Sequence, residues 1–208
     1  VCVLPAAPCP RTCQMTVFGA LVVSTRTELP DGRAPIQTNV VPPVEQPQWI
    51  SRVWERVREE VGKGHQAYVV CPRISGDDPD VTELEELYGD EGELRARPPL
   101  AAVEEVVAEL TTHELAGLRV SALHGRMTPD EKDRTMRAFA AGEIDVLVST
   151  TVIEVGVDVA NATTMVLMDA DRFGISQLHQ LRGRVGRGGL PGLCLLVSNA
   201  YHGSPARV

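Results

Sequence analysis

Three arginines lie close together near the end of the chain, in the stretch QLHQLRGRVGRGG at residues 177–189. A guanidinium group is well suited to bind a phosphate, because its planar fork donates paired hydrogen bonds to oxygen atoms. Ser176 is suited to cap a helix that begins at Gln177. At about 100° per residue, such a helix would place three polar side chains in one row: Gln180, Arg184 and Arg187. Like charges on one face repel each other, so this row predicts an anion bound beside it.

The glycines between these arginines can be interpreted in two ways. Gly183 and Gly186 remove Cβ atoms, which would let a nucleotide or another backbone approach closely, at a cost of about 1 kcal/mol each in helix propensity. Alternatively, the glycines end the helix, and the arginines belong to a solvated turn. The spacing leaves both interpretations open. Leu178, Leu181 and Val185 form a separate apolar row, which indicates a helix packed on a core.

Five short apolar runs have the composition of buried strands. None alternates strictly between apolar and polar residues, which predicts strands that are covered on both faces, as in a parallel sheet. The runs are QAYVVC (66–71), RVSALH (119–124), DVLVST (145–150), TMVLMD (164–169) and LCLLV (193–197).

Helical patterns separate these runs. An apolar stripe within residues 50–61 predicts a helix that ends at Gly62-Lys63-Gly64, and a second stripe lies within residues 103–110. A third helix opens at Thr128-Pro129-Asp130-Glu131, which has the spacing of a capping box. Its predicted core contacts are Met136 and Phe139. Strands that alternate with helices predict an α/β fold, with a mostly parallel sheet, right-handed crossovers and helices on both faces.

Composition divides the chain into a domain and its flanks. Residues 1–47 contain eight prolines and are predicted to form an extended connector. Residues 48–200 would form the α/β domain, with an acidic insertion at about 75–99. Because the chain does not begin with Met, we expect a fragment, in which residues 201–208 begin a truncated C-terminal extension.

Polar residues follow three of the predicted strands at the point where each strand ends. Ligands of parallel sheets bind at the carboxyl ends of the strands, so these residues mark a predicted ligand edge. Hydroxyl and amide N–H groups at such turns are donors that hold a DNA phosphate without reading the base sequence. The three clusters are His124-Gly125-Arg126, Ser149-Thr150-Thr151 and the residues from Asp169 to Arg172. A plain turn or a helix cap is the alternative interpretation of Thr150 and Thr151.

The chain carries a net charge of −8, and nine acidic residues lie within the segment 77–93. This balance argues against a protein that coats nucleic acid by bulk charge, but it allows a local basic strip. No apolar run approaches the ~20 residues that span a bilayer, so we expect a cytoplasmic protein with no membrane partner. The five cysteines include no CxxC pair, which favours reduced thiols and no metal site.

Four motifs resemble those of superfamily 2 helicases and translocases, in the order of that family. QLRGRVGR at 180–187 resembles motif VI, VSTTVIEVGVDVANA at 148–162 resembles motif V, and LHGRM at 123–127 resembles motif IVa. PRTCQMT at 10–16 resembles the tail of a motif III segment, although the residues just before it depart from the family pattern. The combination is most similar to the RecG family of branched-DNA translocases.

This resemblance implies a RecA-like second motor domain, the helicase C-terminal domain. Arg184 and Arg187 would be arginine fingers that reach the terminal phosphate of ATP. The other residues implied to contact the nucleotide are Gln180, Gly156, Asp158 and Gly183. The residues implied to contact the DNA are Thr150, Thr151, His124, Gly125, Arg126, Arg11 and Thr12.

The resemblance also implies parts that the sequence does not contain. Gly62-Lys63-Gly64 lacks the rest of a phosphate-cradling GxxxxGK loop, and Asp130-Glu131 is interpreted as a helix cap, not as a DExx box for Mg²⁺. A first RecA-like domain, expected before residue 1, would bind most of ATP and Mg²⁺, so this fragment alone is not expected to hydrolyse ATP. Its expected partners are branched or double-stranded DNA, during fork regression and Holliday-junction processing, and the N-terminal RecA-like and wedge domains of the full-length chain.

Two other functions fit the same residues. The transcription-repair coupling factor shares much of the motif pattern, and it would have RNA polymerase as its partner. A RecA-like module could also bind DNA or protein without ATP. The loss of ATPase activity on mutation of Arg187 would distinguish a motor from such a module.

Overall fold

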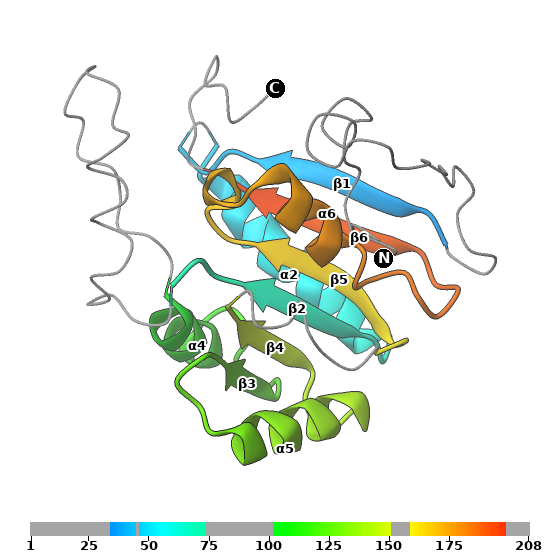
Figure 1. The fold of residues 1–208 in the computed structure, drawn as a ribbon. Helices are drawn as coiled ribbons and strands as arrows, with labels where there is room; N and C mark the ends of the chain where they lie inside the picture. Colours follow the sequence, from blue (N-terminus) through cyan, green and yellow to red (C-terminus); the bar gives the residue numbers. More distant parts are fainter. Residues whose placement is uncertain (1–33, 45, 74–101, 151–158, 199–208) are drawn as a thin grey trace, which may run out of the picture.

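The structure is a computed structural model, which describes residues 34–44, 46–73, 102–150 and 159–198. The strands form one six-stranded sheet in the order β1-β6-β5-β2-β4-β3, and every neighbouring pair is parallel. The five strands predicted from apolar runs are confirmed as β2 to β6. The strands are β1 (Ile36–Val41), β2 (Gln66–Val70), β3 (Val120–Leu123), β4 (Val146–Ser149), β5 (Ala162–Leu167) and β6 (Gly192–Val197) (Figure 1).

Helices cover both faces of the sheet, as predicted. α2 (Gln48–Gly62) and α4 (Val103–Thr112) pack on one face, and α5 (Pro129–Ala140) and α6 (Ile175–Arg182) pack on the other. Figure 1 shows α6 in front of the sheet and α2 behind it. A short 3₁₀ helix, η3 (Ala170–Arg172), lies between β5 and α6. Within the described ranges, every helix is too short or too polar to cross a membrane.

Successive residues of the central strands enter different cores, which explains why these strands are apolar throughout. In β2, Ala67 and Val69 pack with the helices α2 and α4. Tyr68 points to the opposite face, where its ring centroid lies 4.9 Å from that of Phe139 in α5. Phe139 is fully buried and Met136 packs partly buried beside it, so both predicted core contacts of α5 are confirmed.

The start of α5 confirms the predicted capping box. Thr128 Oγ1 accepts a hydrogen bond from the Glu131 N–H at 3.3 Å, and Glu131 Oε2 accepts one from the Thr128 N–H at 2.8 Å. These bonds satisfy N–H groups that have no partner inside the helix. They also hold the pKa of the Glu131 carboxyl below its usual value. Asp130-Glu131 is therefore part of a helix cap.

The end of α2 explains the Gly62-Lys63-Gly64 sequence. Lys63 is the C-cap of the helix, and its N–H donates to the Glu60 carbonyl oxygen at 3.1 Å, while the Gly64 N–H donates to the Val61 carbonyl oxygen at 2.8 Å. Gly64 follows with φ of +87°, a left-handed conformation that favours glycine. This sequence is a helix terminus, as predicted.

The structure places a strand inside the predicted connector at 1–47. β1 pairs in parallel with β6, from Ile36 opposite Gly192 to Val41 opposite Val197. β1 lies at the edge of the sheet, and four of its six residues are exposed. Its sequence IQTNVV is correspondingly polar, because an edge strand is covered less than a central strand. The sheet therefore begins before residue 48.

Cys71 and Cys194 are free thiols that are fully buried in the sheet. Burial raises the pKa of Cys194 to about 12. Burial and the nearby Asp169 carboxylate raise the pKa of Cys71 as well. Such thiols stay protonated and pack as small apolar side chains, as predicted for them. The other three cysteines lie outside the described residues: Cys2, Cys9 and Cys13.

An ion pair joins the amino ends of β3 and β4. Asp145 Oδ2 accepts hydrogen bonds from the Arg119 backbone N–H at 2.8 Å and from its Nε at 3.1 Å, and Oδ1 accepts one from Nη2 at 2.5 Å. The Arg119 guanidinium holds the pKa of Asp145 below its usual range, against the opposing effect of partial burial. The bidentate geometry fixes the register of the two strands at this end.

We predict that Asp145→Asn lowers the free energy of unfolding by about 1–2 kcal/mol at neutral pH, because charged hydrogen bonds are lost but solvent screens the exposed arginine. The folded pKa lies below the ordinary value of 3.8, so the contribution is present above that value and lost as the pH falls through the folded pKa. Denaturant unfolding of both chains over a pH series measures this difference. The control is Asp133→Asn, which removes the partner of Arg137 in an exposed pair on α5 and should change the free energy of unfolding little. If Asp145→Asn still lowered the free energy of unfolding in strong acid, the prediction would be contradicted.

Candidate functional site

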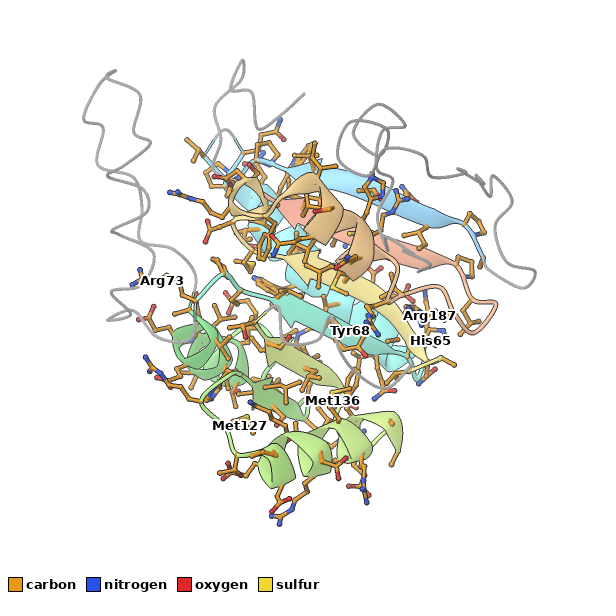
Figure 2. All side chains as sticks on the ribbon, in the orientation of Figure 1. His65, Tyr68, Arg73, Met127, Met136 and Arg187 are labelled. Carbon is orange, nitrogen blue, oxygen red and sulfur yellow. The ribbon has the colours of Figure 1, made fainter. Side chains whose placement is uncertain are left out.

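The motif VI arginines lie at the edge of the sheet where the strands begin, here called the amino edge. α6 carries the chain back from the end of β5 toward the start of β6, and residues 183–191, here called the motif VI loop, complete this return. In Figure 2, Arg187 and His65, which precedes β2, lie at one end of the strands, whereas Arg73, which follows β2, lies at the other.

The predicted helical row of three polar residues is wrong. α6 begins at Ile175 after Gly174, where Gln177 Oε1 accepts a hydrogen bond from the Gly174 N–H at 3.1 Å, so Ser176 is not the cap. The helix ends at Arg182, and Gly183 is its C-cap. Gln180 therefore lies in the helix, whereas Arg184 and Arg187 lie in the loop that follows. Glycine ends the helix, as in the alternative interpretation of these residues.

The motif VI loop has a defined shape although it is not helical. The Arg184 N–H donates to the Leu181 carbonyl oxygen at 2.9 Å, and this bond closes a tight turn directly after α6. Leu181 and Val185 are fully buried and anchor this turn in the core below α6, as predicted for the apolar row. The Arg187 Nε donates to the Gly183 carbonyl oxygen at 2.8 Å. This bond satisfies a carbonyl at the negative end of the helix and ties the guanidinium to its own loop.

The two glycines on either side of Arg187 contact β1 and the turn that precedes β5. Gly186 has φ of +73°, and a Cβ at this position would lie 3.1 Å from Cγ1 of Ile36 in β1. Gly188 lies against Ala160, and a Cβ there would overlap the Ala160 carbonyl oxygen. The loop therefore contacts the start of β1 through Gly186 and Ala160 through Gly188.

The residues that lead into β5 form a tight, hydrogen-bonded turn, Val159–Ala162, here called the β5 entry turn. The Ala162 N–H donates to the Val159 carbonyl oxygen at 3.2 Å, and the Gln66 N–H donates to the Asn161 carbonyl oxygen at 3.1 Å. The Asn161 Nδ2 donates to the Gly64 carbonyl oxygen at 2.8 Å. Its Oδ1 lies 3.2 Å from His65 Nδ1. Because the amide nitrogen is engaged elsewhere, Oδ1 accepts, and His65 Nδ1 carries the hydrogen.

Residues of this turn and of its partner segment were not among the predicted site residues. Gln66 is 3% exposed, and its Nε2 donates to the carbonyl oxygens of Phe139 at 2.6 Å and Ile144 at 2.7 Å. A glutamine that opens an otherwise apolar strand was the available signal, because a buried amide requires partners. These bonds join the amino edge to the end of α5.

A hollow of about 520 Å³ opens at the amino edge beside the motif VI loop. Glu60, at 8% exposure, lies in its wall and accepts hydrogen bonds from Lys63 Nζ at 2.8 Å and from Thr163 at 3.4 Å. Burial would raise the pKa of Glu60, but Lys63 and Arg56 together hold it below its usual value. Arg56 Nη2 lies 3.0 Å from the same carboxylate. In this wall, the negative charge of Glu60 is therefore balanced by the positive charges of Lys63 and Arg56.

The predicted ligand edge at the strand ends, the carboxyl edge, brings two of the expected clusters together. β3 and β4 are neighbours, and the Thr150 N–H donates to the Leu123 carbonyl oxygen at 3.3 Å. His124 follows Leu123 directly, and its Nδ1 is buried with no hydrogen-bond partner among the described residues. Arg126 is exposed, and Lys132 Nζ of α5 donates to the Gly125 carbonyl oxygen at 2.9 Å.

The third cluster, from Asp169 to Arg172, lies farther along the same edge. β2 separates β5 from β4, so Arg73 at the end of β2 lies between this cluster and Thr150. Asp169 is a buried non-glycine residue with φ of +48°. Ser198, after β6, donates through Oγ to Asp171 Oδ1 at 3.1 Å. Arg73 and Lys132 were not among the predicted site residues: Arg73 follows the predicted strand 66–71, and Lys132 reaches this edge from α5 through its bond to Gly125.

Several predicted site residues lie outside the described residues: Thr151, Gly156, Asp158, Arg11 and Thr12. Among the described residues, no group of three or more His, Cys, Asp or Glu side chains is placed to hold a metal ion.

Residues 52–189 match the family of helicase conserved C-terminal domains. This range extends from α2 to the motif VI loop and includes residues at both edges of the sheet. The chain belongs to this family. As a helicase C-terminal domain, it has the predicted α/β fold with a parallel sheet. Dbp5 of S. cerevisiae, bound to RNA and ADP BeF3, shares this fold with a TM-score of 0.51 at 16% identity over 91% of this chain and 42% of that one.

The helicase C-terminal domain is similar to part of RecG over nearly its whole length. The ATP-dependent DNA helicase RecG of Mycobacterium leprae is 55% identical over 204 residues, which cover 98% of this chain and 26% of the relative. RecG of Streptococcus pneumoniae is 45% identical over 96% of this chain and 26% of the relative. A solved structure of RecG bound to a three-way DNA junction has a TM-score of 0.67 at 39% identity, and the match covers 97% of this chain and 23% of that one. The chain thus spans about a quarter of these relatives, and the predicted resemblance to RecG is confirmed.

We predict that Gly186→Ala lowers the free energy of unfolding by about 1–2 kcal/mol, because the left-handed backbone conformation disfavours a side chain, and because Ile36 crowds the new methyl group. Gly62→Ala is the matched control: its φ is not left-handed and its Cβ position has no atom within 4 Å. Chemical denaturation of both variants measures the difference. Equal stability of the two variants would contradict the assigned loop conformation.

Proposed function

We propose that this chain is the second motor domain of an ATP-dependent double-stranded DNA translocase or helicase that acts on branched DNA, as in fork regression and Holliday-junction processing. The observation that carries the proposal is the motif VI loop, in which Arg187 is tied to the end of α6 and its flanking glycines contact the start of β1 and the turn before β5. The similarity to RecG over 98% of this chain supports the choice of substrate.

The residues at the amino edge suit the phosphates of a nucleotide. Arg184 and Arg187 supply guanidinium donors, and the missing Cβ atoms of Gly186 and Gly188 keep the loop close to the sheet. ATP would supply the bond that is broken, and most of its contacts and those of Mg²⁺ would come from a first RecA-like domain. Arg184 and Arg187 would stabilise the negative charge that develops on the transferred phosphoryl group. Gln180, Gly183, Gly156 and Asp158 would line the same site.

The residues at the carboxyl edge suit the DNA backbone. Thr150 and His124 leave neighbouring strands, and exposed Arg126 adds a positive charge beside them. Donors of this kind contact phosphate oxygens and carry no sequence information, as expected for a translocase that follows a duplex. Gly125 and Thr151 would complete this surface, and Arg11 and Thr12 would add contacts from the motif III remnant.

The chain by itself is proposed to lack ATPase activity. Its sequence contains no GxxxxGK loop to cradle the β and γ phosphates. An arginine finger accelerates phosphoryl transfer only when another site holds the nucleotide. The wedge domain and the first RecA-like domain of the full-length protein are therefore the proposed partners of this chain.

We predict that Arg187→Ala in the full-length protein reduces the DNA-stimulated kcat for ATP hydrolysis by about 10³- to 10⁵-fold, the loss expected for an arginine finger. Steady-state ATPase assays with a three-way junction measure this loss, and fork unwinding should fall in parallel. Arg137→Ala is the matched control, because this arginine lies on the exposed face of α5, with 78% of its side chain accessible.

Undiminished ATPase activity and unwinding in Arg187→Ala would show that Arg187 is not an arginine finger. The absence of DNA-stimulated ATPase activity in the unaltered full-length protein would favour a RecA-like binding module. If ATPase activity were lost but the protein bound RNA polymerase and ignored branched DNA, the coupling-factor type of translocase would be the better assignment.

We predict that Arg126→Ala weakens DNA binding by a similar factor for every DNA sequence, because the proposed contact is to phosphate. The slope of log K against log salt should fall by about 0.9, which corresponds to one lost phosphate contact. Fluorescence anisotropy with several duplexes at a series of salt concentrations tests both parts. Arg52→Ala, on α2 at the opposite face of the sheet, should leave the slope unchanged; a change of slope there would show that the effect is one of overall charge.

A further inference from the structure

We propose that the contact between Gly188 and the β5 entry turn positions Arg187, so that Gly188 and Asn161 are positioning residues for the proposed phosphoryl-transfer reaction. This inference rests on the proposed function, because it concerns how the arginine finger is held. It assigns a purpose to a glycine that lies beside the arginines and to an asparagine at the end of motif V.

The β5 entry turn is a firm support for the loop. Asn161 is bonded through its backbone to Gln66, and through its side chain to Gly64 and His65. Gln66 is itself buried and bonded to the end of α5. A turn that is fixed by several hydrogen bonds to a central strand moves only when those bonds break. Ala160 is therefore presented at a fixed position.

Position 188 favours glycine for a different reason from the neighbouring glycine positions. Gly186 and Gly189 have φ of +73° and +75°, which is sufficient to favour glycine at both positions. Gly188 is not among the glycines with positive φ, so its backbone conformation is open to other residues. A Cβ at Gly188 would nevertheless overlap the Ala160 carbonyl oxygen. This is a backbone atom, and it cannot turn away as the end of a long side chain can.

Arg187 follows any movement of this loop. Its Nε donates to the Gly183 carbonyl oxygen at 2.8 Å, so this bond ties the guanidinium to its own loop. Its backbone lies between Gly186, which contacts β1, and Gly188, which contacts the β5 entry turn. A methyl group at Gly188 would push the loop away from the β5 entry turn and would tilt the Arg187 guanidinium. Catalysis by a positioned charge is sensitive to such shifts, since a displacement of ~1 Å can cost ~10²-fold in rate.

The test uses Gly188→Ala in the full-length protein, assayed for ATP hydrolysis with a three-way junction. We expect kcat to fall by about 10²-fold, while KM for ATP changes little, because the finger acts mainly in the transition state. Gly62→Ala makes the same chemical change where no atom lies within 4 Å, and it should keep the parent kcat. A parent-like kcat in Gly188→Ala would overturn the inference.

A combination with Arg187→Lys separates positioning from general damage. Lysine keeps the charge but loses the guanidinium fork that the loop orients. Gly188→Ala should therefore reduce kcat much less in the Arg187→Lys background than in the parent protein. Equal fold-losses in the two backgrounds would mean that Gly188 does not act through Arg187, and the inference would fail. If Arg187→Lys alone kept full activity, the arginine-finger role in the proposed function would fail, which is a different result.

Asn161→Ala provides a second variant in case Gly188→Ala does not fold. It removes the side-chain bonds to Gly64 and His65 but introduces no overlap. We expect a smaller loss of kcat with the same small change in KM, and the same reduced effect beside Arg187→Lys. Thermal unfolding of each variant identifies the ones that are folded at the assay temperature. A folded Asn161→Ala protein with parent kcat would overturn the role of the β5 entry turn.

Discussion

The parallel order of all six strands is the constraint on which the placement of both proposed sites depends. Each connection in such a sheet must return the chain from the carboxyl edge to the amino edge. α6 makes this return between β5 and β6, and it ends where Gly183 caps it. The arginines that follow the helix are therefore at the amino edge. A strand of five residues, such as β2, spans ~17 Å, so no side chain reaches both edges.

This separation divides the chemistry of the domain. His124 and Thr150 mark the carboxyl edge, whereas Arg184 and Arg187 mark the amino edge. The connection from β4 to β5 begins at Thr150 and ends in the β5 entry turn, on which Gly188 rests. The two ends of motif V therefore lie beside the two proposed sites.

The fold could be predicted from the sequence wherever burial was complete. β2 and β4 are covered on both faces, so their apolar runs are unmistakable, and the capping box at Thr128 gives a purely local signal for the start of α5. β1 escaped prediction because an edge strand needs few apolar residues, and IQTNVV follows a proline-rich segment. Its place in the sheet is decided by pairing with β6, a contact distant in sequence.

The candidate site was predictable in its residue types but not in its geometry. The arginine spacing fits one face of a helix, yet the helix ends at its cap Gly183, and Gly186 has a left-handed conformation that an α-helix does not contain. The proposed support of Arg187 is the contact between its neighbour Gly188 and Ala160, a residue whose side chain carries no chemistry. In the sequence, a close approach of two backbones is visible only as a glycine. Glycine occurs in turns for several physical reasons, however, and a left-handed φ is the commonest of them. Gly188 becomes informative only when its φ and its neighbours are known, because those two facts together leave the close approach as the reason for glycine.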